Sequence, residues 1–276
     1  MNYRECYLYG REKLKAAEIA EYELDARLLL EAVCHTDRTT MFAHPDREVD
    51  DKEYAAYAEY IAKRAEHIPL QHLTGVQDFM GLEFYVNQDV LIPRQDTEIL
   101  VEEVMLNLHD GMRILDMCTG SGCILCSLLH YSNDCQGVGV DLSERALAVA
   151  EENAEKLAVR NYSFIKSDLF EKVEGKFDMI VSNPPYIKSD VIRTLMPEVR
   201  DHEPLMALDG MDDGLLFYRK IIAEAEAYLW RGGKLFFEIG YDQGEAVGRL
   251  MREAGFRDVC VKKDYAGLDR VVFGEI

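Results

Sequence analysis

From residue 112 to the C-terminus, the sequence alternates between short apolar segments typical of β-strands and longer amphipathic segments typical of helices. The predicted strands read RILDM, QGVGVD, SFIKSD, FDMIVSN and KLFFEIG, and VCVKK and RVVFG close the chain as an expected antiparallel pair. Helices are expected at 121–130, 143–157, 212–229 and 243–254. This alternation predicts a mostly parallel, doubly wound α/β sheet of seven strands.

The first 70 residues have a different pattern and predict helices only. The stretch 17–33 combines strong helix formers with apolar residues three and four positions apart. A second helix is expected after Asp50 and Asp51, which suit an N-cap, and Pro69 is expected to end it. Its apolar face is expected to carry Tyr54, Tyr57, Tyr60, Ile61 and Ala65. Residues 72–92 then favour a hairpin, and a further helix is expected over about 97–108.

The composition restricts the partners that this chain can have. Its 276 residues are 48% apolar, and the formal net charge of −20 is negative both before and after residue 70. Binding to duplex nucleic acid requires clustered Lys and Arg, so this charge argues against an extended nucleic-acid interface. No apolar run approaches the roughly 18 residues of a membrane helix, and the N-terminus has no apolar signal-peptide core. We therefore expect a cytoplasmic protein with no membrane partner.

Seven cysteines are scattered along the chain, which suits free thiols in a reducing compartment. Cys123 and Cys126 form a CxxC pair, but no second Cys or His pair lies near it at metal-binding spacing. We therefore expect no metal site, and we interpret both cysteines as small apolar residues on a helix under a glycine loop.

The segment Asp116-Met117-Cys118-Thr119-Gly120-Ser121-Gly122 follows a predicted strand and opens a helix. Glycines here let the backbone approach a ligand closely, and a nucleotide-type cofactor across the strand ends is the functional interpretation. Asp141 ends the next strand, where an acid can accept both ribose hydroxyl protons. An exposed helix-capping role for Asp141 is the alternative. Asp168 is expected to end the third strand, near the exocyclic amine of an adenine.

Two cofactors fit these features unequally. NAD requires a third glycine at the fingerprint spacing to bind its pyrophosphate, and this turn lacks it. S-adenosylmethionine has no phosphate, and acidic strand ends suit its amino group and sulfonium. The turn resembles the class I methyltransferase loop DxGxGxG, with Cys118 in place of the first glycine. If that position requires a positive φ, the Cβ of Cys118 is strained there.

The sequence Asn183-Pro184-Pro185-Tyr186 ends the fourth predicted strand. An amide nitrogen is a poor nucleophile because its lone pair is conjugated, as the roughly 18–20 kcal/mol barrier to amide rotation indicates. The Asn183 side-chain oxygen and the Pro184 carbonyl can accept its two N–H groups and stabilise positive charge on the nitrogen. Tyr186 can stack on the planar group. A plain Asn-Pro-Pro turn is the alternative.

Tetrapeptides of this kind occur in adenine-N6 DNA methylases, guanine-N2 rRNA methylases and glutamine-N5 protein methylases. Further motifs identify the chain as resembling the HemK/PrmC family, the glutamine-N5 methyltransferases of peptide chain release factors. The resemblance covers nearly the whole chain. Its motifs are PLQHLTG at 69–75, LIPRQDTE at 91–98, the cofactor loop, NPPYI at 183–187, EP at 203–204, DGL at 213–215, FEIG at 237–240 and KDYAGLDR at 263–270. Gln95 stands where many members have proline.

The resemblance implies an N-terminal helical substrate-recognition domain at 1–70, a β-hairpin linker at 71–92 and a class I methyltransferase domain at 93–276. It implies the glutamine of the release factor's GGQ loop as substrate and S-adenosylmethionine as cofactor. Asn183 to Tyr186 would hold the glutamine. The cofactor contacts that it implies are Arg94, Thr97, Asp116, Met117, Cys118, Thr119, Gly120, Gly122, Asp141, Leu142, Asp168, Leu169 and Asn183.

Two alternatives from other functional classes remain at this point. A nucleic-acid methylase that flips its target base could use the same tetrapeptide, although the acidic charge and the missing basic region favour a protein substrate. A cofactor-binding regulator without activity is the other, and the intact tetrapeptide argues against it. For Thr97 and Glu98, a role in capping the following helix is also open.

Overall fold

The computed structural model describes residues 1–276 and divides into two compact units. The first unit comprises Met1–Gly75 together with Met196–His202, and the second comprises Val76–Leu195 and Glu203–Ile276. No helix is both long enough and apolar enough to cross a membrane. The predicted domain boundaries at residues 70 and 92 stay predictions. The contacts assign the hairpin to the second unit and the short segment 196–202 to the first.

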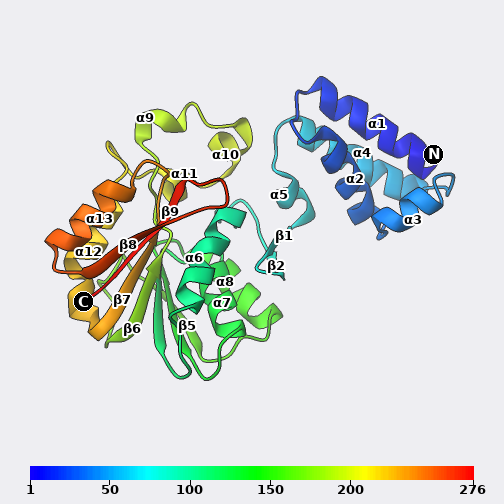
Figure 1. The fold of residues 1–276 in the computed structure, drawn as a ribbon. Coiled ribbons are helices and arrows are strands. Elements are labelled where there is room, and N and C mark those ends of the chain that lie inside the picture. Colours follow the sequence, from blue (N-terminus) through cyan, green and yellow to red (C-terminus); the bar gives the residue numbers. More distant parts are fainter. The chain divides into compact units, whose positions relative to one another are not determined.

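The first unit is a bundle of helices (Figure 1). Its helices are α1 (Tyr3–Ala16), α2 (Tyr22–Val33), α3 (Arg38–Ala43), α4 (Asp51–Ala65), α5 (Leu70–Thr74) and α10 (Pro197–His202). The predicted start of α4 is confirmed, because Asp50 and Glu53 form a capping box there. Tyr57 and Ile61 of α4 lie fully in the core, as the helical spacing predicted.

Two boundaries predicted for the first unit are wrong. The helix expected over 17–33 begins only at Tyr22. Glu18, which lies between α1 and α2, has a left-handed φ of 58° and so interrupts the helical path. Pro69 does not end α4, which stops at Ala65. It is the N-cap residue of α5 instead. Proline has no N–H to contribute to a helix, so it suits a position at the start of a helix as well as one beyond its end.

A buried ion-pair network holds α10 in the first unit. The Arg64 guanidinium donates to Asp25 at 2.7 Å and to Glu198 at 2.9 Å, and His67 lies 3.2 Å from the same Glu198 oxygen. Glu198 follows Arg64 by 134 residues in the chain. Buried charges are tolerated when they are paired in this way, which explains why a segment so distant in sequence packs with the N-terminal helices.

The second unit contains a hairpin, a seven-stranded sheet and the helices that cover the sheet. The strands are β1 (Val76–Phe79), β2 (Leu82–Tyr85), β3 (Arg113–Met117), β4 (Gln136–Asp141), β5 (Tyr162–Lys166), β6 (Phe177–Ser182), β7 (Leu229–Glu238), β8 (Arg257–Lys263) and β9 (Asp269–Glu275). The helices are α6 (Gln95–Met105), α7 (Cys123–His130), α8 (Glu144–Lys156), α9 (Ser189–Ile192), α11 (Leu205–Leu208), α12 (Leu216–Tyr228) and α13 (Gly244–Glu253).

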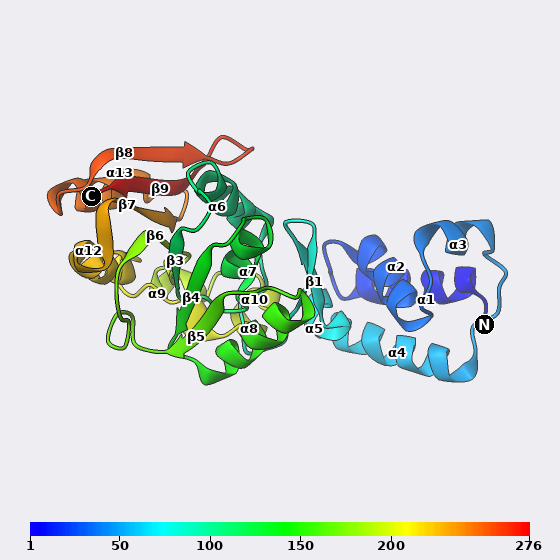
Figure 2. The ribbon, with the colours of Figure 1, turned by 90° about the horizontal axis from the view of Figure 1, so that it is seen from below.

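The sheet has the strand order β5-β4-β3-β6-β7-β9-β8. The first five strands in this order are parallel, and β9 is antiparallel to both β7 and β8. Side chains of α12 and α13 bury one face of the sheet and those of α6 and α7 bury the other, an arrangement that Figure 2 shows in the second unit. The doubly wound fold, its closing antiparallel pair and the β1–β2 hairpin are therefore confirmed.

Parallel order brings the carboxyl ends of β3, β4, β5 and β6 to one edge of the sheet, where ligands bind in open α/β folds. The glycine turn after β3 and the tetrapeptide after β6 are therefore neighbours, because β3 and β6 pair directly. Ser182, the last residue of β6, donates its hydroxyl to the Met117 carbonyl at 2.6 Å. This bond links the start of the glycine turn to the start of the loop that contains the tetrapeptide.

Candidate functional site

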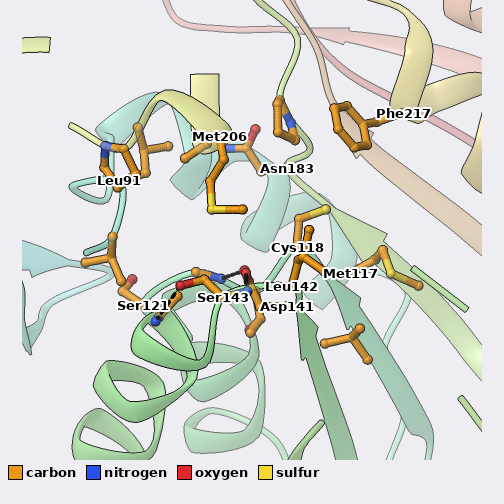
Figure 3. A pocket seen from close by; sticks show the side chains of 18 of the residues that line it. Leu91, Met117, Cys118, Ser121, Asp141, Leu142, Ser143, Asn183, Met206 and Phe217 are labelled. Carbon is orange, nitrogen blue, oxygen red and sulfur yellow. Dashed lines mark hydrogen bonds between the residues drawn. The ribbon is translucent and has the colours of Figure 1, made fainter. Parts of the chain in front are cut away.

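A cavity of about 520 Å³ opens at this edge of the sheet, entirely within the second unit. Its volume lies in the range of small-molecule sites, roughly 300–1,000 Å³. Figure 3 shows Ser121, Asp141 and Ser143 on one side and Asn183, Met206 and Phe217 on the other. Most of the lining is apolar, with a few polar groups from the loops that follow the strands.

Most of the predicted site residues line this cavity, and some do not. Those that line it are Thr97, Met117, Cys118, Thr119, Gly120, Asp141, Leu142, Asp168, Leu169, Asn183 and Pro185. Those that lie outside its lining are Arg94, Asp116, Gly122, Pro184 and Tyr186. The ligand contacts assigned to each of these residues stay predictions.

Asp141 shapes the glycine turn through its carboxylate. One oxygen accepts the Gly120 N–H and the other accepts the Ser143 N–H, both at 2.9 Å. Burial raises the pKa of Asp141, and these backbone donors oppose the shift. Ser143, and not Asp141, is the N-cap residue of α8. Asp141 therefore does not have the exposed capping role that was the alternative interpretation.

Asp116 lies behind the turn and is fully buried. One of its oxygens accepts the Thr119 hydroxyl at 2.6 Å, and the other has no partner with hydrogen-bond geometry. Burial is the main reason that the pKa of Asp116 rises to about 7, and the hydrogen bond from Thr119 opposes this shift. When the pKa of a carboxyl lies near neutral pH, a cation bound nearby lowers it and favours the ionised form.

Cys118 confirms the suspicion that its position favours glycine. Its φ is 63°, and Gly120 and Gly122 have φ values of 56° and 76°. A side chain in the left-handed region is strained by its Cβ. A Cβ added to Gly120 would meet nothing within 4 Å, so the turn stays open toward the cavity.

The Asp168 segment differs slightly from its prediction. The strand β5 ends at Lys166, so Asp168 lies in the turn beyond it and does not end the strand. Leu169 follows with a left-handed φ of 49°. Both residues line the cavity.

The tetrapeptide residues point in different directions. Asn183 faces the cavity and donates its Nδ2 group to the Thr97 hydroxyl oxygen at 3.3 Å. The Tyr186 hydroxyl donates to Glu238 Oε1 at 3.2 Å, and burial raises the pKa of Tyr186. Thr97 therefore contacts Asn183 directly, whereas the Tyr186 hydroxyl is committed to a carboxylate at the end of β7.

Arg94 is not directed into the cavity. Its Nη2 atom lies 2.6 Å from each carboxylate oxygen of Glu203, a residue that is 6% exposed. This pair ties the start of α6 to the segment before α11. The departure at Gln95 has a simple explanation, because Gln95 is the first residue of α6. Proline is well tolerated at that position but is not required there.

The sequence interpretation missed three sets of residues. The first is Glu238, which lies within the quoted FEIG motif but had no assigned role. The second lines the cavity from the chain before α6, the segment around α11 and the start of α12, and comprises Asp89, Val90, Leu91, Pro93, Pro204, Leu205, Met206, Ala207, Asp209, Met211 and Phe217. The third lies near the glycine turn and the ends of β4 and β5, and comprises Cys123, Ile124, Val140, Ser143, Ala146 and Ser167. The LIPRQDTE motif contains Leu91 and Pro93, the EP motif contains Pro204, and the DGL motif lies just before Phe217, so these motifs were a signal for part of the second set.

The comparisons with known proteins cover both units. Residues 5–75 match the family model described as the PrmC N-terminal domain, and residues 94–198 match the methyltransferase small domain. A release factor glutamine methyltransferase from Geobacter sulfurreducens is 42% identical over 97% of this chain and 94% of its own length. One from Clostridium botulinum is 40% identical over 98% of this chain and 97% of its own.

Among solved structures, a methyltransferase from Pyrococcus furiosus superposes with a TM-score of 0.54 at 18% identity. The match covers 78% of this chain and 98% of that protein. At this identity the likeness shows the fold alone, which is that of a methyltransferase domain.

Proposed function

Because the chain belongs to the family of release factor glutamine methyltransferases, we propose that it methylates the side-chain amide nitrogen (N5) of the glutamine in the GGQ loop of a peptide chain release factor. The methyl donor in this proposal is S-adenosylmethionine. The observation that carries the proposal is one cavity with the glycine turn and Asp141 on one side and Asn183 on the other. A cofactor and an amide can meet there.

The residues of the cavity fit this cofactor. Asp116, which lies behind the glycine turn and outside the lining, has a buried oxygen without a partner of hydrogen-bond geometry, and a cation bound in the cavity would favour its ionised form. The carboxylate of Asp141 faces the open turn at Gly120. The apolar side chains of Leu142, Leu169 and Phe217 line the same cavity and suit a flat heterocycle. When bound, S-adenosylmethionine supplies an electrophilic methyl group.

The tetrapeptide would activate the glutamine by orientation. Asn183 Nδ2 is committed to Thr97, which leaves the Asn183 carbonyl oxygen to accept one N–H of the substrate amide. The Pro184 carbonyl would accept the other. Two acceptors hold the NH₂ group and stabilise positive charge that develops on its nitrogen. Correct alignment supplies much of the remaining acceleration, so no strong base is required before transfer.

We also propose a division of labour along the chain. Residues 1–70 would recognise the release factor, 71–92 would form the linker, and 93–276 would bind the cofactor and catalyse transfer. This is supported by the separate hydrophobic core of the N-terminal helices and by the separate family match over residues 5–75.

The test is methyl transfer from labelled S-adenosylmethionine to a purified release factor, to its GGQ→GGA variant, and to bulk RNA and DNA. We expect label on the release factor alone, and none on the variant. Label on nucleic acid but not on the factor would support the base-flipping alternative and refute the proposal. Equal label on both forms of the factor would refute the assignment to the glutamine.

A further inference from the structure

Two buried carboxamide side chains contact the two functional loops of the cavity from outside its lining. Asn153 lies on α8 and is fully buried, and Gln243 precedes α13 and is 6% exposed. A buried amide group is destabilising unless its hydrogen bonds are satisfied. The partners of each amide therefore indicate what its position contributes.

Asn153 contacts the glycine turn. Its Nδ2 group donates to the carbonyl oxygen of Ser121 at 2.9 Å and to that of Tyr85 at 3.0 Å, and its Oδ1 atom accepts the Tyr85 N–H at 2.6 Å. Ser121 belongs to the turn and lines the cavity. The helix α8 also packs closely on the turn, since a Cβ on Gly122 would lie 3.0 Å from the Ala150 Cβ. Asn153 thus ties the glycine turn to α8 and to β2.

Gln243 makes equivalent contacts at the tetrapeptide. Its Nε2 group donates to the carbonyl oxygen of Tyr186 at 3.1 Å and to that of Gly214 at 3.2 Å, and its Oε1 atom accepts the Gly240 N–H at 2.9 Å. Although Gln243 is the N-cap residue of α13, its side chain makes no capping hydrogen bond with that helix. It ties the last residue of the tetrapeptide to the chain after β7 and to the segment after α11.

The partners fix the orientation of both amides, because all of these contacts are made with backbone groups. A backbone carbonyl only accepts a hydrogen bond, and a backbone N–H only donates one. Each NH₂ group must therefore face its two carbonyls, and each side-chain oxygen must face its N–H. Neither amide can flip without losing these bonds, and substitutions in neighbouring side chains leave the partners in place.

The backbone around Tyr186 has little space to move. A Cβ on Gly210 would lie 2.7 Å from the Tyr186 Cα, so the two stretches of backbone are in close contact. The Gly210 N–H also donates to the Ile187 carbonyl at 2.8 Å. Gln243 adds the bond that fixes the Tyr186 carbonyl itself. Such fixing matters for a transfer reaction, because a displacement of 1 Å can lower a rate by about 100-fold.

We propose that Asn153 and Gln243 are positioning residues with separate tasks, in which Asn153 fixes the glycine turn for the methyl donor and Gln243 fixes the tetrapeptide for the substrate amide. The inference rests on the proposed function, in which the donor lies at the glycine turn and the amide at Asn183. Neither side chain belongs to the lining, so each acts through the loop that it contacts.

The first test uses the isosteric acids Gln243→Glu and Asn153→Asp. Each keeps its acceptor oxygen but loses the NH₂ group that satisfies two carbonyls. Gln243→Glu should lower kcat for the release factor about tenfold or more, with the Kd for S-adenosylhomocysteine within about twofold of wild type. Asn153→Asp should raise that Kd about tenfold or more, with kcat at saturating S-adenosylmethionine within about twofold.

Asn107→Asp is the matched control. Asn107 is a half-buried carboxamide just beyond α6 that donates to the Glu103 carbonyl at 2.9 Å and accepts from Lys234 at 2.7 Å. It has no hydrogen bond to either loop, so both constants should stay within about twofold. A general loss of stability would lower melting temperatures without separating the two constants. A change in the same constant in Gln243→Glu and Asn153→Asp, or in neither constant, would overturn the inference.

Hydrogen–deuterium exchange of the protein alone separates this inference from the proposed function. Gln243→Glu should speed exchange about fivefold or more at Ile187 and Gly210, and Asn153→Asp should do so at Thr119 and Gly122, whose N–H groups are all bonded to backbone carbonyls. Unchanged or uniformly faster exchange would overturn the inference. Absence of methyl transfer by the wild-type protein to any release factor would instead refute the proposed function, and the exchange rates would still test both positioning roles.

Alanine variants keep the inference testable if an isosteric variant does not fold. The space that alanine leaves is lined by the same carbonyl and N–H groups, so water can enter and replace part of the lost hydrogen bonds. Gln243→Ala and Asn153→Ala should then show the same separation of kcat and Kd. Failure of both variants at one position to fold would mean that this amide is required for folding itself, and would overturn its role in positioning.

Discussion

At the glycine-turn side of the cavity, both oxygens of Asp141 accept backbone N–H groups. At the opposite side, Asn183 donates its side-chain NH₂ group to the side-chain hydroxyl of Thr97. The first arrangement depends on the course of the chain and survives most changes of neighbouring side chains. The second depends on which group donates each proton. In the proposed function the glycine-turn side would bind the cofactor and the Asn183 side would orient the amide, so substitutions on the two sides should affect different kinetic constants.

The largest effect is expected from Asn183→Ala at the amide side. Transfer should fall by at least about 100-fold because an acceptor for the developing charge is lost. Cofactor affinity, measured by calorimetry, should remain within threefold of wild type. Activity within threefold of wild type would refute the assigned difference between the two sides, because the orientation of the amide would then not depend on Asn183.

Asp141→Asn tests the cofactor side and should have the converse signature. The new NH₂ group would oppose either the Gly120 or the Ser143 N–H, since both point at the carboxylate. A lost charge-assisted hydrogen bond is worth about 1.5–3 kcal/mol, so we expect the cofactor Kd to rise about tenfold or more. At saturating cofactor, kcat should be nearly retained. A fall in kcat with an unchanged Kd would reverse the roles of the two sides.

A further test is the pH dependence of folding stability in the protein without cofactor. The folded-state pKa of Asp116, about 7, exceeds the ordinary value of 3.8, so between these values the folded protein keeps a proton that the unfolded chain releases. Stability from this group is therefore fully present at low pH and is lost as pH rises through 7. Asp116→Asn should flatten the fall in melting temperature between pH 5 and pH 8 without cofactor. Parallel curves for the variant and wild type would contradict the raised pKa.

The smallest effect is expected at Cys118. Its left-handed backbone strains any side chain, and glycine removes a penalty of about 1 kcal/mol. Cys118→Gly should therefore raise the melting temperature by a few degrees. Cys118→Ala keeps the Cβ and serves as the control, which should show no such gain. Equal melting temperatures for the glycine and alanine variants would mean that strain is not what distinguishes this position.

The sheet was predictable from the sequence because each buried parallel strand is a short apolar run between turn residues. The strands β3, β4 and β6 match their predicted segments closely. The region of residues 186–212 was not predictable. Its helices α9, α10 and α11 have only four to six residues each, too few to establish a helical period.

Lining residues were predictable where they belong to one contiguous motif, as in the glycine turn and the tetrapeptide. It was not predictable where function depends on contacts between distant segments. Glu238 follows Tyr186 by 52 residues, and Asn183 follows Thr97 by 86. No periodicity relates such positions. Only the order of the strands, which makes β3, β6 and β7 neighbours, brings these side chains together.

In the proposed function, the cavity holds a glutamine amide for methylation. Tandem mass spectrometry of a release factor incubated with the enzyme and S-adenosylmethionine tests it most directly. We predict one added methyl group, on the side-chain nitrogen of the GGQ glutamine, with none after incubation with the Asn183→Ala enzyme. A methyl group on any other residue, or an unmodified glutamine after incubation with active wild-type enzyme, would contradict this account.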